Sequence, residues 1–431
     1  MASPRRPDHP YQWTTLPGGL GVVVRPMPQA ASAAIGVWVR AGGRYESSDL
    51  AGISHFIEHL VFKGTRTRSC EALKQAIEGV GGLLNAFTAE EFTCYLAKVP
   101  SRHVGRAITI LSDMVLHPAF RARDIDRERE VILEEIRMYE DTPAQYVHEL
   151  FNQLLWPNHP LGHLLAGTVG SVRRITHTDL TAYWKRFYHP RHMLVSGAGA
   201  MQGDAAVRQL RRAFGRAGTG TLQRMSPAPR PQRGPQVRLL NKKTEQTHVC
   251  LGTPALSRAH RLRFAMELVH VLLGANMSSR LFHEVREKRG LVYEIGTHIK
   301  RYKDTGAFVI YAGCDAAKLP TMIETVMGEL RRLKRERVRA AELRRAKEFY
   351  TGQLTMGLED TMDHMCWMGE QAITVGRVGR PEDVISSIER VTAAQIQQVA
   401  RLLFQAGHLY MAAIGPIPLQ QAVALRALCT P

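Results

Sequence analysis

Residues 51–65 read AGISHFIEHLVFKGT and contain the pattern H-x-x-E-H. Their apolar residues recur every three or four positions, which predicts an amphipathic helix. On a helix, His55 and His59 are one turn apart and project from the same face. That geometry suits a single metal ion, and Glu58, also one turn from His55, can act as a general base on a water beside the metal.

A tetrahedral catalytic zinc takes three protein ligands and keeps one position open, so a third ligand is needed. The helix predicted over residues 123–139 offers two adjacent carboxylates, Glu134 and Glu135. Glu135 has the more apolar one-turn neighbours, which favours it as an inward-facing ligand, because burying an unpaired carboxylate is costly. These neighbours are Val131, Ile132, Met138 and Tyr139. Glu128, two turns before Glu135, could hydrogen-bond a ligand. An ordinary charged helix is the alternative for Glu135 and Glu128.

The flanking sequence predicts a series of strands and helices. Val- and Ile-rich runs bounded by Gly or Pro predict the strands, and apolar residues at helical spacing predict the helices. The predicted strands cover residues 20–27, 33–40, two runs within 83–99, and 193–199, and the predicted helices cover 70–80, 104–116, 146–155 and 178–188.

A stretch without periodicity divides the chain. Residues 215–236 are rich in Gly, Pro and Arg and are predicted to form a linker. We therefore predict a metal-bearing domain at 1–214 and a second domain at 237–431.

The second half weakly repeats the first. The helix predicted at 341–354 aligns with residues 124–136 and places Gln353 where Glu135 stands. The second half contains no H-x-x-E-H. The repeat therefore predicts a C-terminal domain of the same fold without the metal motif.

Composition restricts the class of protein. A chain of 431 residues is too long for one ordinary core. It contains no run of 18 apolar residues, so no spanning helix and no membrane partner are expected. The N-terminus lacks the apolar core of a secretory signal, which predicts a cytoplasmic location. The 6 cysteines form no C-x-x-C pair and are expected to be free thiols.

The formal net charge of +18 raises the question of nucleic-acid binding. Arginine is spread along almost every predicted helix instead of being concentrated on one element. The densest run, residues 331–345, is interrupted by glutamates and apolar residues. This pattern is typical of a solvated helix face, and no nucleic-acid partner is expected.

One segment of the second half, residues 274–295, is rich in polar side chains. Arg286 and Tyr293 have polar tips that could meet a substrate carbonyl. A surface arginine and a buried tyrosine are the equally simple alternative.

With these residues identified, the chain resembles the pitrilysin-type metallopeptidases that carry an inverted zinc motif. Among them it is most similar to the bacterial enzymes that resemble mitochondrial processing peptidase. The similarity extends over essentially the whole chain. It rests on H-x-x-E-H followed by LVFKGT at 60–65, on GGLLNAFT at 81–88, on EREVILEE at 128–135 and on the residues from Ser279 to Tyr293.

The resemblance implies a zinc peptidase site in the first half. It implies one zinc ion per chain, held by His55, His59 and Glu135. Glu58 would be the catalytic base, and Glu128 would support a ligand.

The resemblance also implies substrate-binding residues in both halves. Arg286 and Tyr293 would bind or polarise the scissile carbonyl. The strand that carries Asn85, Ala86 and Phe87 would hold the substrate backbone.

The implied fold is α+β, with two homologous αβ-roll domains, each a mainly antiparallel sheet flanked by helices. The implied activity is zinc-dependent endopeptidase action on unstructured peptides or processing segments, inside a chamber closed by two chains. The zinc motif and the Arg/Tyr pair are both present, which favours an active homodimer. The alternatives are a catalytically silent scaffold or partner subunit of the same fold, and a nucleic-acid-binding protein.

Overall fold

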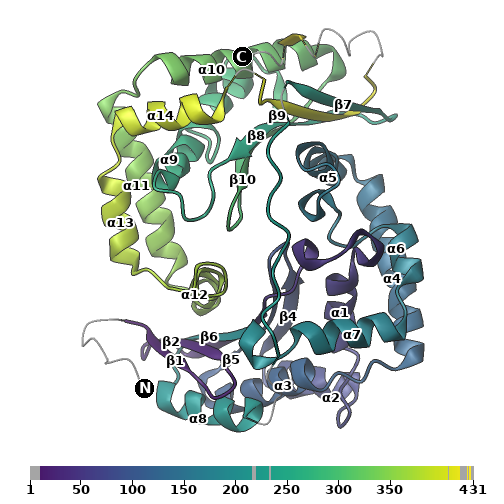
Figure 1. The fold of residues 1–431 in the computed structure, drawn as a ribbon. Helices are drawn as coiled ribbons and strands as arrows, with labels where there is room; N and C mark the ends of the chain where they lie inside the picture. The colour runs from purple at the N-terminus through teal and green to yellow at the C-terminus, as the bar shows by residue number, and fades with distance from the viewer. Residues whose placement is uncertain are drawn as a thin grey trace. The chain divides into compact units, whose positions relative to one another are not determined.

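The computed structural model describes residues 10–215, 220–232, 234–405 and 407–417, together with residues 425, 427 and 428. The chain forms two compact units, each with its own sheet (Figure 1). Each unit is assembled from three separate segments. Unit 1 comprises Met1–Ile136, Leu164–Ser226 and Thr355–Arg380, and unit 2 comprises Arg137–His163, Pro227–Leu354 and Pro381–Pro431.

The sheet of unit 1 has the strand order β1-β2-β6-β3-β5-β4. Only β2 and β6 pair in parallel, and the other neighbours are antiparallel. Because β4 is the last strand of this order, one of its edges is unpaired in the sheet. The strands are β1 Gln12–Thr15, β2 Gly21–Pro26, β3 Ser32–Val39, β4 Leu83–Thr88, β5 Thr93–Pro100 and β6 Met193–Gly199.

Both faces of this sheet are buried, because side chains alternate along each strand. Val37 and Val39 face a large core, whereas Trp38 faces a smaller one formed with α12. Helices α3 and α8 lie on one side of the sheet and α12 lies on the other (Figure 1). The helices of unit 1 are α1 Ile53–Val61, α2 Cys70–Glu78, α3 Val104–Leu116, α4 Ala122–Asp141, α6 Val169–Arg174, α7 His177–Phe187, α8 Gly203–Phe214 and α12 Thr361–Val375, with α4 continuing into unit 2.

The sheet of unit 2 has the strand order β7-β11-β8-β10-β9. Only β7 and β11 pair in parallel. The order and strand directions of β2-β6-β3-β5-β4 are therefore repeated. The strands are β7 Gln236–Asn241, β8 Thr247–Ala255, β9 Val292–Arg301, β10 Gly306–Cys314 and β11 Tyr410–Gly415.

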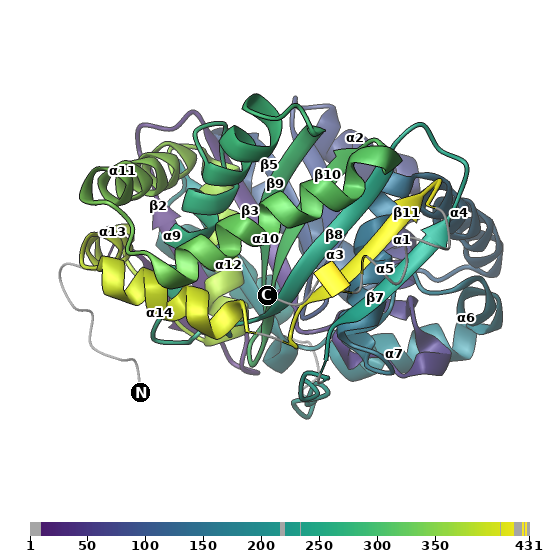
Figure 2. The same cartoon turned by 90° about the horizontal axis from the view of Figure 1, so that it is seen from above.

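Helices also cover both faces of the second sheet. α5 packs on one face, and α9, α10 and α14 enclose the core of the other, where Figure 2 shows α10 and α14 lying across the strands. The helices of unit 2 are α5 Pro143–Leu155, α9 Arg263–Leu273, α10 Leu319–Arg335, α11 Ala340–Gly357, α13 Pro381–Glu389 and α14 Ala393–Leu403, with α11 ending in unit 1.

Each half of the sequence gives one helix to the unit of the other half. α12 follows the long helix α11 and packs on the first sheet, and α5 follows the long helix α4 and packs on the second. The contact of α12 is specific, because Ser196 accepts a 2.7 Å hydrogen bond from Nε1 of Trp38 and donates one to the carbonyl of Met365. The predicted domains divide at the linker, whereas the compact units place α5 in unit 2 and α12 in unit 1.

The predicted fold class is confirmed, with two related α+β sheets flanked by helices. α3 has the predicted bounds, whereas α5 begins at Pro143 instead of residue 146, because proline is well suited to the first helical position. Residues 220–232 of the predicted linker contain no helix or strand, and β7 already begins at Gln236. Among the described helices, none is both long and apolar enough to cross a membrane. Cys429 lies outside the described residues, and the other cysteines are free thiols.

Candidate metal centre

The motif helix α1 is tightly packed beneath the first sheet. Its apolar face contributes Ile53, Phe56, Ile57, Leu60 and Val61 to the core. The histidines of the motif therefore project from a helix that cannot rotate without exposing this core.

The start of α1 is fixed by close backbone packing and by a buried carboxylate. Gly52 has φ 94°, and a Cβ atom there would lie 2.5 Å from the carbonyl oxygen of Ala166, so only glycine fits. The two oxygens of Glu46 accept hydrogen bonds from the amides of Gly52 and Ser54, at 2.7 and 2.8 Å. Ser54 also bonds to the hydroxyl of buried Tyr183 at 2.9 Å. These contacts satisfy amides that the first turn of a helix leaves free.

His55, His59 and Glu135 converge, and one ligand atom from each lies within 4.8 Å of the others. Oε2 of Glu135 is 3.8 Å from Nε2 of His55 and 3.6 Å from Nε2 of His59. Donor atoms about 2.1 Å from a tetrahedral ion lie about 3.4 Å from one another. The donor types and spacings therefore fit a zinc ion. Among the described residues this is the one such cluster of three or more His, Cys, Asp or Glu side chains.

The surroundings of Glu135 on α4 differ in part from those predicted from the sequence. Its neighbours Val131 and Met138 are 43% and 55% exposed, so the predicted apolar stripe is wrong at these two positions. The buried face of α4 instead consists of Ile125, Glu128, Ile132, Leu133 and Ile136. Glu135 lies at the margin of this face and is partly buried, whereas Glu134 is exposed.

Glu128 connects the motif histidine to a lysine. Its Oε2 lies 3.1 Å from Nδ1 of His59, and its Oε1 lies 2.7 Å from Nζ of Lys63. Burial would raise the pKa of Glu128, but the hydrogen bonds with His59 and Lys63 outweigh it and lower the pKa. An ionised Glu128 therefore orients the His59 ring with Nε2 toward Glu135.

The two histidines are in different electrostatic surroundings. Burial and the neighbouring His59 lower the pKa of His55 to about 3, so His55 is neutral at pH 7, the form that binds metals. Burial would also lower the pKa of His59, but the hydrogen bond to Glu128 and the charges of Glu135 and Glu58 outweigh it and raise the pKa. Nδ1 of His55 is buried and has no hydrogen-bond partner among the described residues.

Glu58 lies beside the cluster and is oriented by a threonine at the end of β4. Thr88 donates its hydroxyl to Oε2 of Glu58 at 2.5 Å. Burial raises the pKa of Glu58, and the bond from Thr88 opposes this rise. The pKa of this carboxyl is thus shifted toward neutral pH, which suits a group that takes and gives a proton.

The predicted substrate-binding residues Asn85, Ala86 and Phe87 lie on β4, the strand with the unpaired edge. Asn85 is exposed, and its Oδ1 accepts from the amide of Ala86. Phe87 is 37% exposed and contacts Trp38 edge to face.

Arg286 and Tyr293 belong to unit 2. Arg286 is the penultimate residue of a π-helical stretch, Phe282–Glu287, and Tyr293 is the second residue of β9. The guanidinium carbon of Arg286 lies 5.5 Å from the centre of the Tyr293 ring. Tyr293 is 74% exposed, so the alternative of a buried tyrosine is wrong. β9 is the last strand in the order of the second sheet, as β4 is in the first.

Three residues of the site were missed from sequence, namely Glu46, Lys63 and Thr88. Lys63 and Thr88 stand inside the quoted stretches LVFKGT and GGLLNAFT, so the motifs already contained the signal. The sequence around Glu46 did not indicate its contact with α1, because that contact depends on how the chain turns between residues 46 and 52.

Comparison with known proteins identifies the family. Residues 21–169 match the family model described as Insulinase (Peptidase family M16), and residues 174–350 match the model described as Peptidase M16 inactive domain. A protein of Streptomyces coelicolor named an uncharacterized zinc protease is 38% identical over 415 residues, covering 95% of this chain and 90% of the relative. The chain belongs to peptidase family M16. The resemblance seen in the sequence is thereby confirmed.

A further sequence relative and two solved structures are also similar to this chain. An uncharacterized zinc protease of Bacillus subtilis is 34% identical over 390 residues, covering 90% of this chain and 95% of the relative. A crystal structure of a protease from Helicobacter pylori has a TM-score of 0.88 at 20% identity, covering 94% of this chain and 99% of that chain. A peptidase M16 inactive domain from Pseudomonas fluorescens has a TM-score of 0.86 at 18% identity, covering 95% and 98%. The match of the second half to the inactive-domain model agrees with its lack of H-x-x-E-H.

Proposed function

We propose that this M16 protein is a zinc-dependent endopeptidase that hydrolyses unstructured peptides or processing segments. The observation that carries the proposal is the convergence of His55, His59 and Glu135 with Glu58 beside them on the same helix. The names of the relatives, zinc proteases, support it.

In this proposal one zinc ion per chain is held by His55, His59 and Glu135, and Glu128 keeps the His59 ring in place. When bound, zinc would supply Lewis acidity, which would polarise a peptide carbonyl and lower the pKa of water towards 7. The raised pKa of His59 widens the pH range in which its charged form competes with zinc, and zinc binding within that range would release a proton.

Glu58 is the proposed general base. Thr88 occupies its Oε2, which leaves Oε1 to take the proton of the attacking water. The same carboxyl then gives that proton to the departing amine. The raised pKa of Glu58 makes the second transfer easier than it would be from an ordinary glutamate.

The proposed substrate mode is addition of an extended peptide to the free edge of β4. Backbone hydrogen bonds at a sheet edge recognise an extended chain and are largely independent of its side chains. Asn85, Ala86 and Phe87 would contact the added strand. This mode favours unfolded segments over folded proteins.

Arg286 and Tyr293 are proposed to bind the scissile carbonyl. Removal of one such donor typically costs about 10²–10³ in rate. Kinetics of Tyr293→Phe test the assignment, with Tyr350→Phe, in α11, as the matched control. A kcat of Tyr293→Phe equal to that of the control would contradict it.

We also propose that two copies of the chain close the chamber in which cleavage occurs, and that the protein is cytoplasmic. Light scattering on the purified chain measures directly whether it forms a dimer. A mass of one chain at micromolar concentration would contradict the homodimer, and a stable complex only with a different protein would identify it as a partner subunit.

The deciding experiment is cleavage of an unstructured peptide mixture by the purified chain. Glu58→Gln and chelation followed by zinc addition are the paired controls. We expect cleavage by the wild type, none by Glu58→Gln, and recovery of chelated wild type by zinc. Cleavage that survives in Glu58→Gln would refute the assigned base, and a chain with neither zinc nor cleavage would be the silent scaffold.

A further inference from the structure

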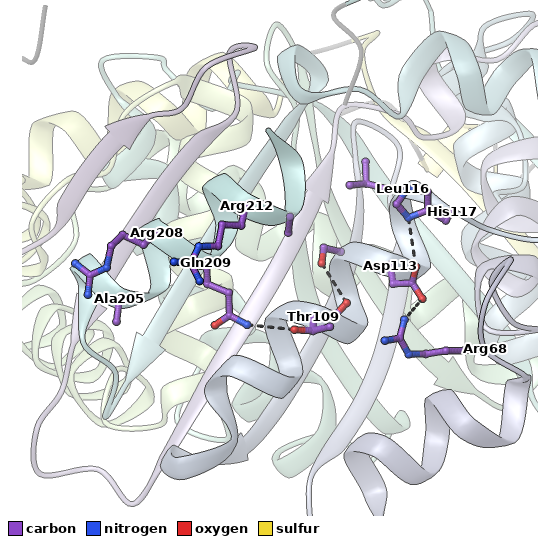
Figure 3. A pocket seen from close by; sticks show the side chains of 11 residues that line it. Arg68, Thr109, Asp113, Leu116, His117, Ala205, Arg208, Gln209 and Arg212 are labelled. Carbon is purple, nitrogen blue, oxygen red and sulfur yellow. Dashed lines mark hydrogen bonds and ion pairs between the residues drawn. The ribbon is translucent and has the colours of Figure 1, made fainter. Parts of the chain in front are cut away.

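A hollow of about 590 Å³ lies on unit 1 between α3 and α8 (Figure 3). α3 contributes Thr109, Asp113 and His117 at its end, and α8 contributes Arg208 and Arg212. Arg68, from the turn between α1 and α2, also lines the hollow. None of these residues belongs to the candidate metal centre.

Asp113, the one acid among the described residues of the lining, is already neutralised. Oδ2 of Asp113 is paired with Arg68 and accepts a hydrogen bond from Thr65, and its Oδ1 lies 3.3 Å from Nδ1 of His117. Figure 3 shows Arg68 and His117 both directed at this carboxylate. Asp113 therefore fixes two cationic or polar groups in the hollow and has little capacity left to compensate further charge.

Arg208 and Arg212 are the uncompensated charges. No acidic partner is found for either among the described residues, and Figure 3 marks no contact between either arginine and Asp113, the one acid that it draws. They are four residues apart on α8 and so share a face, an arrangement that destabilises a helix by like-charge repulsion. Gln209, between them, bonds to the carbonyl of Gly105 at 2.5 Å and to the hydroxyl of Thr109 at 3.1 Å. α8 is thus fastened to α3 with its two free guanidinium groups at the hollow.

We propose that this hollow binds a small polyanion that carries two or more adjacent phosphoryl groups. Guanidinium groups match phosphate oxygens in geometry and remain charged at every physiological pH. The volume is that of a small-molecule site. Arg208 and Arg212 line a bounded hollow, which suits a small ligand, and the adjacent Arg211 lies outside it.

The binding test uses inorganic tripolyphosphate as the probe, titrated into the full chain by calorimetry at fixed ionic strength. The key variant is Arg212→Gln, and the matched control is Arg211→Gln, which removes the same charge from the adjacent, exposed position outside the hollow. Arg208→Gln is the second test variant. We expect affinity to fall about tenfold or more in Arg212→Gln and Arg208→Gln, and to change less than about twofold in Arg211→Gln.

Three outcomes would overturn the proposal. The first is the absence of saturable tripolyphosphate binding by the wild type. The second is an equal loss in Arg211→Gln, which would mean that net charge and not the hollow attracts the anion. The third is tighter binding of an acidic peptide or of DNA than of tripolyphosphate, with the same arginine dependence. Thermal unfolding of each variant checks that the fold is intact.

Discussion

Glu128 shows how one side chain can determine the geometry of the candidate metal centre without being a ligand. It contacts His59 with one oxygen and Lys63 with the other, so the His59 ring is held from behind. Sequence reasoning found Glu128 by its spacing from Glu135, but not Lys63, whose contact depends on the course of the chain after α1.

We predict that Glu128→Gln weakens zinc affinity by roughly 10–100-fold. The amide is neutral and cannot hold both His59 and Lys63 as the carboxylate does. Zinc titration of the purified variant measures the effect. Glu130→Gln, an exposed change on the same helix, is the control, and equal affinities of the two variants would contradict the role of Glu128.

A second prediction at the level of the residue concerns Thr88. Its hydrogen bond lowers the pKa of Glu58, so its removal in Thr88→Val should raise that pKa further. Because the base must be ionised to act, the acidic limb of the pH profile of kcat should move to higher pH. Thr88→Ser keeps the hydroxyl and should keep the wild-type profile. An unshifted limb in Thr88→Val would show that Thr88 does not tune Glu58.

At the level of the element, α1 owes its position to buried contacts at its start. Glu46 is 5% exposed, although both of its oxygens accept backbone amides. Burial raises the pKa of this carboxyl, whereas its bonds to Ser54 and Gly52 lower it. A negative group at this end also interacts favourably with the helix dipole.

We predict that Glu46→Gln lowers the free energy of unfolding by about 1–2 kcal/mol and weakens zinc binding, because one helix amide loses its acceptor. Thermal and denaturant unfolding measure the first effect, and zinc titration measures the second. Asp49→Asn removes a charge from a side chain that is 88% exposed, and should change neither. A Glu46→Gln variant as stable as Asp49→Asn would contradict the account.

The bounds of several helices could be predicted from the sequence, but the sheet on which each helix packs could not. The spacing of apolar residues predicted α3 and α7 to within one residue. The same patterns could not show that α12 packs on the first sheet and α5 on the second. An amphipathic face indicates that a helix is buried but not against which sheet, and the long helices α4 and α11 carry the following helices into the other unit.

At the level of the whole molecule, the strand order is repeated but the cluster of metal-binding side chains is not, among the residues that the structure describes. Unit 2 keeps the order and directions of the strands, yet no second cluster of metal-binding side chains occurs among the described residues. Gln353, aligned with Glu135 in sequence, lies on α11, the helix that corresponds to α4. The motif and its spacing therefore predicted the three side chains that converge, whereas the contacts of Glu46 and Thr88 required the folded chain.

The central claim is that His55, His59 and Glu135 hold one zinc ion in each chain. The most direct measurement is zinc titration of the wild type beside Glu135→Gln and Glu134→Gln. We predict one tightly bound zinc per chain in the wild type and in Glu134→Gln, and loss of tight binding in Glu135→Gln. Undiminished affinity in Glu135→Gln, or its loss in Glu134→Gln, would contradict the assigned site.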